Sequence, residues 1–128
     1  MSWTVEEIPD QSGRVILITG ANSGIGLEAA SVLAERGAHV ILGCRDPHKG
    51  ETAQRQIAGS TELLTVDLSS LASVRAAAEA LHGRRLDVLI NNAGIMAVPQ
   101  EVSVDGHELQ FATNVLGPFA LTSLLLGQ

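Results

Sequence analysis

Four short apolar runs recur along the chain at nearly even spacing, and segments long enough for a helix separate them. The runs are Val15–Ile18, Val40–Leu42, Leu63–Val66 and Val88–Ile90. Each run is too short for a helix and lacks the polar alternation of a half-exposed strand, so each predicts a strand buried on both faces. Strand, helix, strand, repeated three times, predicts a right-handed parallel winding of the α/β class.

Helix signals fill the intervals between these runs. The predicted helices are Ile25–Arg36, a second that opens with Asp46 as N-cap and Pro47 at its first position, and Ser70–His82. After the fourth run we expect a loop over Asn91–Val104 and an apolar helical stretch from about Asp105 to Leu126. Gly117 and Pro118 interrupt that stretch and predict a break or kink there.

Length and charge narrow the class of protein. The chain has 128 residues, with 8 Lys plus Arg against 14 Asp plus Glu, a net charge of −6. We expect an N-terminal arm over residues 1–12 and one domain over residues 13–128. The acidity argues against a nucleic-acid surface, and no apolar run has the length of a membrane span. The single cysteine, Cys44, fits a reducing cytoplasm, where we expect the protein to be.

A glycine-rich segment, TGANSGIG at Thr19–Gly26, lies between the first strand and the first helix. Glycines there permit a tight turn, let the backbone approach a pyrophosphate, and leave the helix N-terminus free to face negative charge. The alternative is an ordinary strand-to-helix turn, but the position within a βαβ unit favours nucleotide binding. The segment is not a phosphate loop, since no Gly-Lys-Ser/Thr follows.

Four motifs together resemble the short-chain dehydrogenases/reductases in order and spacing. They are TGANSGIG at Thr19–Gly26, Asp67-Leu68 after the third strand, NNAG at Asn91–Gly94, and Asn114 in the following helix. Two further stretches, GCRDPHKG at Gly43–Gly50 and NVLGPFALTSLLL from Asn114 to Leu126, resemble the retinol-dehydrogenase and protochlorophyllide-reductase-like branch, including actinobacterial oxidoreductases. The resemblance implies a Rossmann-type doubly wound sheet with strand order 3-2-1-4, the first half of such a domain.

The resemblance also implies a set of cofactor-binding residues. They are Gly20, Asn22, Ser23, Gly24, Ile25, Gly26, Arg45, Asp67, Leu68, Asn92, Ala93 and Gly94. In the family, Asp67 would contact the adenine ring, although it could also cap the helix that begins near Ser70. Two consecutive asparagines, Asn91 and Asn92, are not needed for an ordinary turn and favour a role beside the cofactor.

Arg45 bears on the choice of cofactor. An acidic side chain after the second strand would bind the ribose 2′-hydroxyl of NAD, but here a guanidinium is offered, which suits a 2′-phosphate. We therefore expect NADP over NAD. Two alternatives stay open: Asp46 is the missing acid, or Arg45 is only a solvated loop charge.

Asn114 matches the family's Asn-Ser-Tyr-Lys catalytic group, in which the asparagine holds a water of the proton relay. The chain has no tyrosine, so the Tyr-x-x-x-Lys pair is absent from it. The resemblance implies an NADP-dependent oxidoreductase acting on a lipophilic alcohol or carbonyl, here truncated after the helix that follows the fourth strand and inactive as it stands. The competing interpretation is a non-catalytic nucleotide-binding or pairing module. The open fourth strand and the final leucines also suggest a homo-oligomer.

Overall fold

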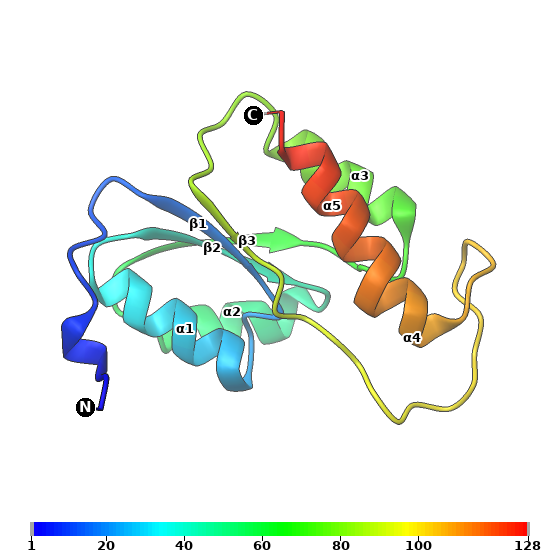
Figure 1. Ribbon diagram of the computed structural model, residues 1–128, viewed down its shortest axis with the longest axis horizontal. Coiled ribbons are helices and arrows are strands. Elements are labelled where there is room, and N and C mark those ends of the chain that lie inside the picture. The colour runs from blue at the N-terminus through cyan, green and yellow to red at the C-terminus, as the bar shows by residue number, and fades with distance from the viewer. Residues whose placement is uncertain (1, 128) are drawn as a thin grey trace.

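A four-stranded parallel sheet in the order β3-β2-β1-β4 organises the chain (Figure 1). The computed structural model describes residues 2–127. Its elements are the 3-10 turn η1 (Val5–Glu7), β1 (Val15–Thr19), α1 (Gly24–Glu35), β2 (His39–Cys44), α2 (Pro47–Arg55), β3 (Ser60–Thr65), α3 (Leu71–Ala80), β4 (Val88–Ile90), α4 (Leu109–Phe111), the π-helical turn η2 (Ala112–Leu116) and α5 (Gly117–Leu125). The predicted α/β class and strand order are confirmed.

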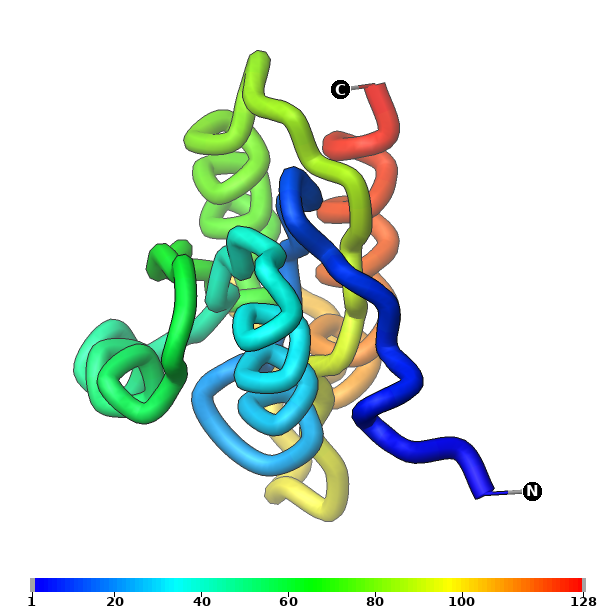
Figure 2. The backbone as a smooth tube through the Cα atoms, turned by 90° about the vertical axis from the view of Figure 1, so that its left-hand side faces the viewer, coloured from blue at the N-terminus to red at the C-terminus, as the bar shows by residue number. Residues whose placement is uncertain are grey.

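Helices cover both faces of the sheet and divide the core into two layers (Figures 1 and 2). On one face, Ala30 and Ala34 of α1 pack against Ile16 and Ile18 of β1 and their neighbours. On the other face, the core residues include Val74 and Ala77 from α3, its C-cap Leu81, Leu121 and Leu125 from α5, and Leu17 and Ile41 from the sheet. The period-2 alternation along each strand sends successive side chains into opposite layers, so both layers depend on the same strands.

The expectation that all four strands are buried on both faces holds only for β1 and β2. Residues 16–19 of β1 and 40–44 of β2 are buried, whereas β3 and β4 are half-buried or exposed throughout. β3 and β4 are less buried because they form the two edges of the sheet. The apolar runs that suggested uniform burial therefore include strands that keep one side open.

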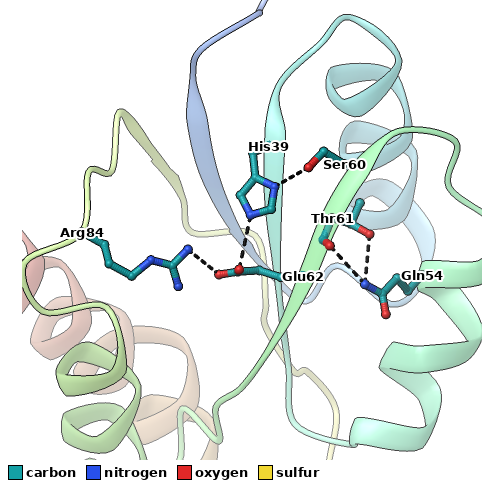
Figure 3. Close-up of polar contacts among 6 residues, drawn as sticks. All are labelled: His39, Gln54, Ser60, Thr61, Glu62 and Arg84. Atoms are coloured by element: carbon teal, nitrogen blue, oxygen red, sulfur yellow. Dashed lines mark hydrogen bonds and ion pairs between the residues drawn. The ribbon is translucent and has the colours of Figure 1, made fainter.

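Polar contacts fasten the outer strand β3 (Figure 3). The imidazole of His39 on β2 lies 2.6 Å from the Ser60 hydroxyl and 3.3 Å from a Glu62 carboxylate oxygen. The second Glu62 oxygen accepts from Arg84, at 2.7 Å, and the Gln54 amide donates to Thr61 on the far side of the strand. These contacts join the edge strand to β2, to α2 and to the loop before β4.

The C-terminal helix departs from its predicted bounds. It begins at Leu109 rather than near Asp105, because Glu108 caps its first turn while residues 103–107 close a tight turn. The Asp105 carboxylate instead accepts from the Leu71 N–H at the start of α3, at 2.8 Å. Neither this helix nor any other within residues 2–127 is long and apolar enough to cross a membrane.

Gly117 and Pro118 do not break the helix, contrary to expectation. Gly117 keeps helical angles (φ −60°, ψ −55°), and the irregularity lies one turn earlier, in the π-helical turn η2. A hydrogen bond from the Gly117 N–H to the Ala112 carbonyl closes that wider turn. Glycine is required at 117 because a Cβ there would lie 2.2 Å from the Leu68 carbonyl oxygen. Gly117 therefore allows close packing of α5 on the loop after β3.

Candidate nucleotide-binding site

A cleft of about 150 Å³ opens where the strands end at their carboxyl edge. It brings together predicted residues from all four strand ends: Gly20, Asn22, Arg45, Asp67, Leu68, Ala93 and Gly94. Sequence reasoning missed Thr19, Gly43, Val66, Ser69, Ile95, Leu109 and Thr113, which also line it. Ser23, Gly24, Ile25, Gly26, Asn92 and Asn114 lie outside its lining. A crevice at this edge is where open α/β sheets bind ligands.

Two glycines of the TGANSGIG segment are required by close approach. Gly20 has φ +66°, and a Cβ on it would lie 2.9 Å from Cα of Ala93. A Cβ on Gly26 would lie 2.2 Å from the Gly20 carbonyl oxygen and 2.5 Å from the Asn92 amide nitrogen. The segment therefore packs backbone against backbone, which is how a pyrophosphate-binding turn keeps side chains away from its ligand.

Thr19 holds the end of β4 beside that turn. Thr19 is a buried residue, 1% exposed. Its hydroxyl accepts hydrogen bonds from the backbone N–H groups of Asn92 and Ala93, both at 3.1 Å. In return, the Asn92 side chain donates to the carbonyls of Thr19 and Gly20, at 3.1 and 3.2 Å. Asn92 is thus a positioning residue for the glycine turn. The sequence analysis included Thr19 in the TGANSGIG segment but gave it no role, although a threonine ending a buried strand could have suggested one.

The N-terminus of α1 points its first turn outward. Ser23, Gly24 and Ile25 are exposed, and among residues 2–127 no side chain caps this helix end. The first N–H groups of a helix have no partner within the helix and carry a partial positive charge. An exposed, uncapped helix start behind a glycine turn is suited to an anionic group.

Basic side chains gather after β2. Arg45 is exposed, lines the cleft, and makes no ion pair within the described part of the chain. It also borders a neighbouring hollow with Asn22 and Lys49. The alternative acid, Asp46, is occupied as the N-cap of α2, accepting from the N–H groups of His48 and Lys49, and these bonds lower the pKa of its carboxyl. Positive charge thus faces the cleft where an acid would select a ribose hydroxyl.

Asp67 does not cap α3, so that alternative is wrong. The hydroxyl of Ser70 occupies the N-cap position, while one Asp67 carboxylate oxygen accepts from the N–H and the hydroxyl of Ser69, at 3.0 and 2.6 Å. The Asp67 N–H donates to Ser73. The loop after β3 is therefore held by its own short bonds and presents Asp67 and Leu68 to the cleft.

Asn114 lies in the π-helical turn and binds the backbone of the loop after β4. Its carbonyl oxygen accepts from the Ile95 N–H at 2.8 Å, and its amide donates to the Ile95 carbonyl at 2.7 Å. Gly94 lies beside it, where a Cβ would meet the Asn114 oxygen at 3.4 Å. In this geometry Asn114 positions the loop that forms one wall of the cleft.

The remaining nucleophile and metal candidates lie apart from this arrangement. Cys44 is buried, and burial raises the pKa of its thiol, which disfavours the reactive thiolate. Within residues 2–127, no three His, Cys, Asp or Glu side chains gather as a metal site.

Comparison with known proteins defines the class. The sequence model of the short chain dehydrogenase family matches residues 14–128, which is most of the chain. The chain belongs to the short-chain dehydrogenase/reductase family, in its retinol-dehydrogenase-like branch.

Particular relatives support this placement. Retinol dehydrogenase 12 of Bos taurus is 47% identical over 123 residues, covering 91% of this chain and 39% of the relative. A crystal structure of an uncharacterised Mycobacterium paratuberculosis protein has 53% identity and a TM-score of 0.94, covering 99% of this chain and 47% of that one. The chain thus spans under half the length of either.

Two similar structures hold nicotinamide cofactors. RhlG of Pseudomonas aeruginosa, in its complex with NADP, is 35% identical, with a TM-score of 0.79. The match covers 91% of this chain and 46% of the RhlG chain. The Brucella melitensis 3-ketoacyl-(acyl-carrier-protein) reductase complexed with NADH is 36% identical, with a TM-score of 0.76. The match covers 91% of this chain and 50% of the reductase chain. These structures support a nicotinamide cofactor and do not distinguish NADP(H) from NAD(H).

Proposed function

We propose that the cleft binds NADP(H) and that the chain forms the cofactor-binding part of an oxidoreductase. The observation that carries the proposal is the glycine turn, where Gly20 and Gly26 leave no room for a Cβ beside the uncapped start of α1. In this proposal the N–H groups at Ser23–Gly26 hold the pyrophosphate, Asp67 and Leu68 border the adenine, and Ala93 and Gly94 border the adjoining ribose.

Arg45 and Lys49 support the phosphorylated form of the cofactor. Both border the hollow beside Asn22, and Arg45 makes no ion pair within residues 2–127. A guanidinium can hold a phosphate through two parallel hydrogen bonds, and an ammonium adds a point charge. Asp46 also borders this hollow and caps α2 through Oδ1 alone, so the preference for NADP depends on the two basic side chains and not on the cap.

The chemistry follows from the class of protein. When bound, the cofactor supplies a hydride exchange with the carbon of an alcohol or carbonyl group. We propose a lipophilic substrate, in keeping with the retinol-dehydrogenase-like branch. The chain's own residues bind and orient the cofactor, and Asn114 fixes the adjoining loop through Ile95. A second candidate is a nucleotide-binding module without catalysis, which is what these 128 residues could supply by themselves, since no tyrosine is among them.

Calorimetric titration with NADPH and NADH tests the cofactor assignment. Arg45→Asp should weaken NADPH binding about 10- to 100-fold, since a charge-assisted bond contributes about 1.5–3 kcal/mol, and should leave NADH binding equal or tighter. Arg75→Asp, the same charge change at an exposed site on α3, is the matched control and should alter neither affinity. Equal affinities of both cofactors for the unchanged chain would show that Arg45 is only a loop charge.

Cofactor oxidation with retinal and steroid carbonyls separates the two candidate functions. The 128-residue chain should bind NADPH without turning it over, because it contains no tyrosine to donate the proton. Loss of a general acid typically lowers rates by about 10²- to 10⁴-fold. Turnover at rates ordinary for enzymes would overturn this expectation and require another proton donor within the chain.

A further inference from the structure

Two segments that line the cleft are also joined to each other outside its lining. The loop after β3 and the helix that begins with α4 both contribute lining residues, which are Asp67, Leu68, Ser69, Leu109 and Thr113. The loop after β3 leads directly into α3, and the turn that holds Asp105 comes directly before α4. Contacts between α3 and this turn can therefore set the shape of the cleft without touching a ligand.

The first contact between the two segments is a hydrogen bond to Asp105. The Leu71 N–H donates to the Asp105 carboxylate at 2.8 Å, across 34 residues of chain. Leu71 is the first residue of α3, where an N–H has no acceptor within the helix and carries a partial positive charge. The carboxylate satisfies this N–H and complements its charge. We call this bond the Asp105–Leu71 clamp.

A tight turn holds Asp105 in place. The N–H of Ser103 donates to the His107 carbonyl at 2.6 Å, and the N–H of Gly106 donates to the Ser103 carbonyl at 3.0 Å. Ser103 is buried, and Gly106 has φ +86°, a conformation that favours glycine. Leu109, which lines the cleft, begins α4 two residues after the turn. The clamp therefore fixes the start of a helix that forms part of the cleft.

The second contact lies further along the same helix, at Gly117. A Cβ there would lie 2.2 Å from the Leu68 carbonyl oxygen and 2.9 Å from the Leu68 Cβ, so the backbone of α5 rests on the loop after β3. Leu109 and Thr113 lie between the two contacts, and the Thr113 hydroxyl donates to the Leu109 carbonyl at 2.8 Å. Residues 105–117 are thus attached at both ends, with the lining residues between the attachments.

We propose that Asp105 is a positioning residue for the nucleotide, because the Asp105–Leu71 clamp holds the two lining segments at the spacing that the adenine half of the cofactor requires. Without the clamp, Gly117 alone would fix the helix, and its Leu109 end would be free to move relative to Asp67 and Leu68. The inference rests on the proposed function, in which Asp67 and Leu68 border the adenine. Coupling between two binding equilibria is reciprocal, so a clamp that strengthens nucleotide binding must itself be strengthened by the nucleotide.

Amide hydrogen exchange in the unchanged chain tests this reciprocity without any substitution. The Leu71 N–H exchanges when the clamp opens, so saturating NADPH should slow its exchange about three- to thirtyfold, the range for residues that act without touching a ligand. The Ser12 N–H is the matched control, because it donates to another exposed aspartate, Asp10, at 3.2 Å, and neither residue lines the cleft. Its exchange should not change. Equal exchange at Leu71 with and without bound NADPH would overturn the proposal.

Substitutions at Asp105 measure the same coupling from the other direction. Asp105→Ala removes the acceptor and should weaken NADPH binding, measured by calorimetry, by about the factor by which NADPH slows Leu71 exchange. Asp105→Asn keeps an oxygen that can accept from the Leu71 N–H and should restore most of the affinity. Asp10→Ala removes the same charge from the arm and should bind NADPH as the unchanged chain does. Full affinity in Asp105→Ala, or no recovery in Asp105→Asn, would overturn the proposal.

Adenosine 2′,5′-bisphosphate, which carries the adenine half of NADPH without the nicotinamide, locates the effect. Asp105→Ala should weaken its binding by the same factor as that of NADPH, and a loss confined to NADPH would overturn the proposal. Circular dichroism reports whether Asp105→Ala folds, and if it does not, the exchange of Leu71 in the unchanged chain still decides. Failure of the proposed function is distinct, because the unchanged chain would then bind neither ligand and this inference would fall with it.

Discussion

Asn114 and Ile95 exchange two hydrogen bonds, at 2.8 and 2.7 Å, across a gap of 19 residues in the chain. The Asn114 side chain therefore satisfies both the N–H and the C=O of one backbone position, much as a neighbouring strand would. The π-helical turn carries this side chain, and such wide turns are found frequently at functional sites. The wall of the cleft after β4 thus depends on a helix that follows it in sequence.

Replacing Asn114 should loosen that wall. Asn114→Ala leaves the Ile95 groups to water, so we expect faster amide hydrogen exchange at Ile95 and a loss of about 0.5–1.5 kcal/mol in unfolding free energy. Asn91→Ala removes one exposed side-chain bond, to Thr122, and is the matched control. Exchange at Ile95 that is equally slow in both variants would contradict the positioning role.

Gly26→Ala should disrupt the glycine turn. The added Cβ would lie 2.2 Å from the Gly20 oxygen and 2.5 Å from the Asn92 amide, and both belong to groups held in place by β1 and β4. Forced overpacking typically costs about 1–3 kcal/mol, which denaturant unfolding measures, and NADPH binding should fall with it. Gly127→Ala, where a Cβ meets nothing within 4 Å, should leave both quantities unchanged. An undisturbed Gly26→Ala protein would show that the turn shifts freely.

Local pattern was enough to predict the frame of the site. The apolar runs gave the four strands, and their end positions brought Gly20, Arg45, Asp67 and Gly94 to one edge, because parallel strands end together. Asp46 and Pro47 predicted the start of α2, and Asp46 does cap it. These features depend on neighbours in sequence or on the period of the strand.

Features that depend on distant contacts were not predictable in the same way. Asp105 was placed in a helix because the local sequence allows one, yet its carboxylate caps α3 at Leu71, 34 residues away. Gly117 and Pro118 predicted a break or kink because the pair interrupts an apolar helical stretch, whereas glycine is needed at 117 for close contact with Leu68. Burial of β3 and β4 was overestimated because an apolar run does not reveal whether its strand lies at an edge.

Asp87 should make the free energy of unfolding depend on pH in the acidic range. The Arg85 guanidinium and the Val15 N–H both donate to its carboxylate and hold the pKa below the ordinary value. A carboxyl whose pKa is lowered in the folded state adds stability above its unfolded pKa of about 3.9, and loses it as pH falls through the folded value. Asp87→Asn should thus be less stable at pH 7, and the difference should begin to shrink near pH 4 and vanish only below the lowered pKa of the folded carboxyl.

Denaturant unfolding between pH 7 and 2.5 measures this difference. Glu79→Gln, at an exposed position on α3, should follow the unchanged chain across the range. A constant gap between Asp87→Asn and the unchanged chain at every pH would assign the loss to packing rather than to charge.

The open side of β4 leads to a last prediction, about self-association. β4 pairs with β1 along one side, and residues 2–127 place no strand on the other. An unpaired apolar edge offers N–H and C=O groups to other chains, so light scattering should show association that increases with concentration. The Asp87 N–H donates to Val15, and alternation along the strand therefore directs the Val88 N–H outward. Val88→Pro removes this donor and should reduce association, while Val32→Thr, on α1, should not. A monodisperse, cooperatively unfolding monomer of several kcal/mol stability would contradict the prediction and show that β4 protects its own edge.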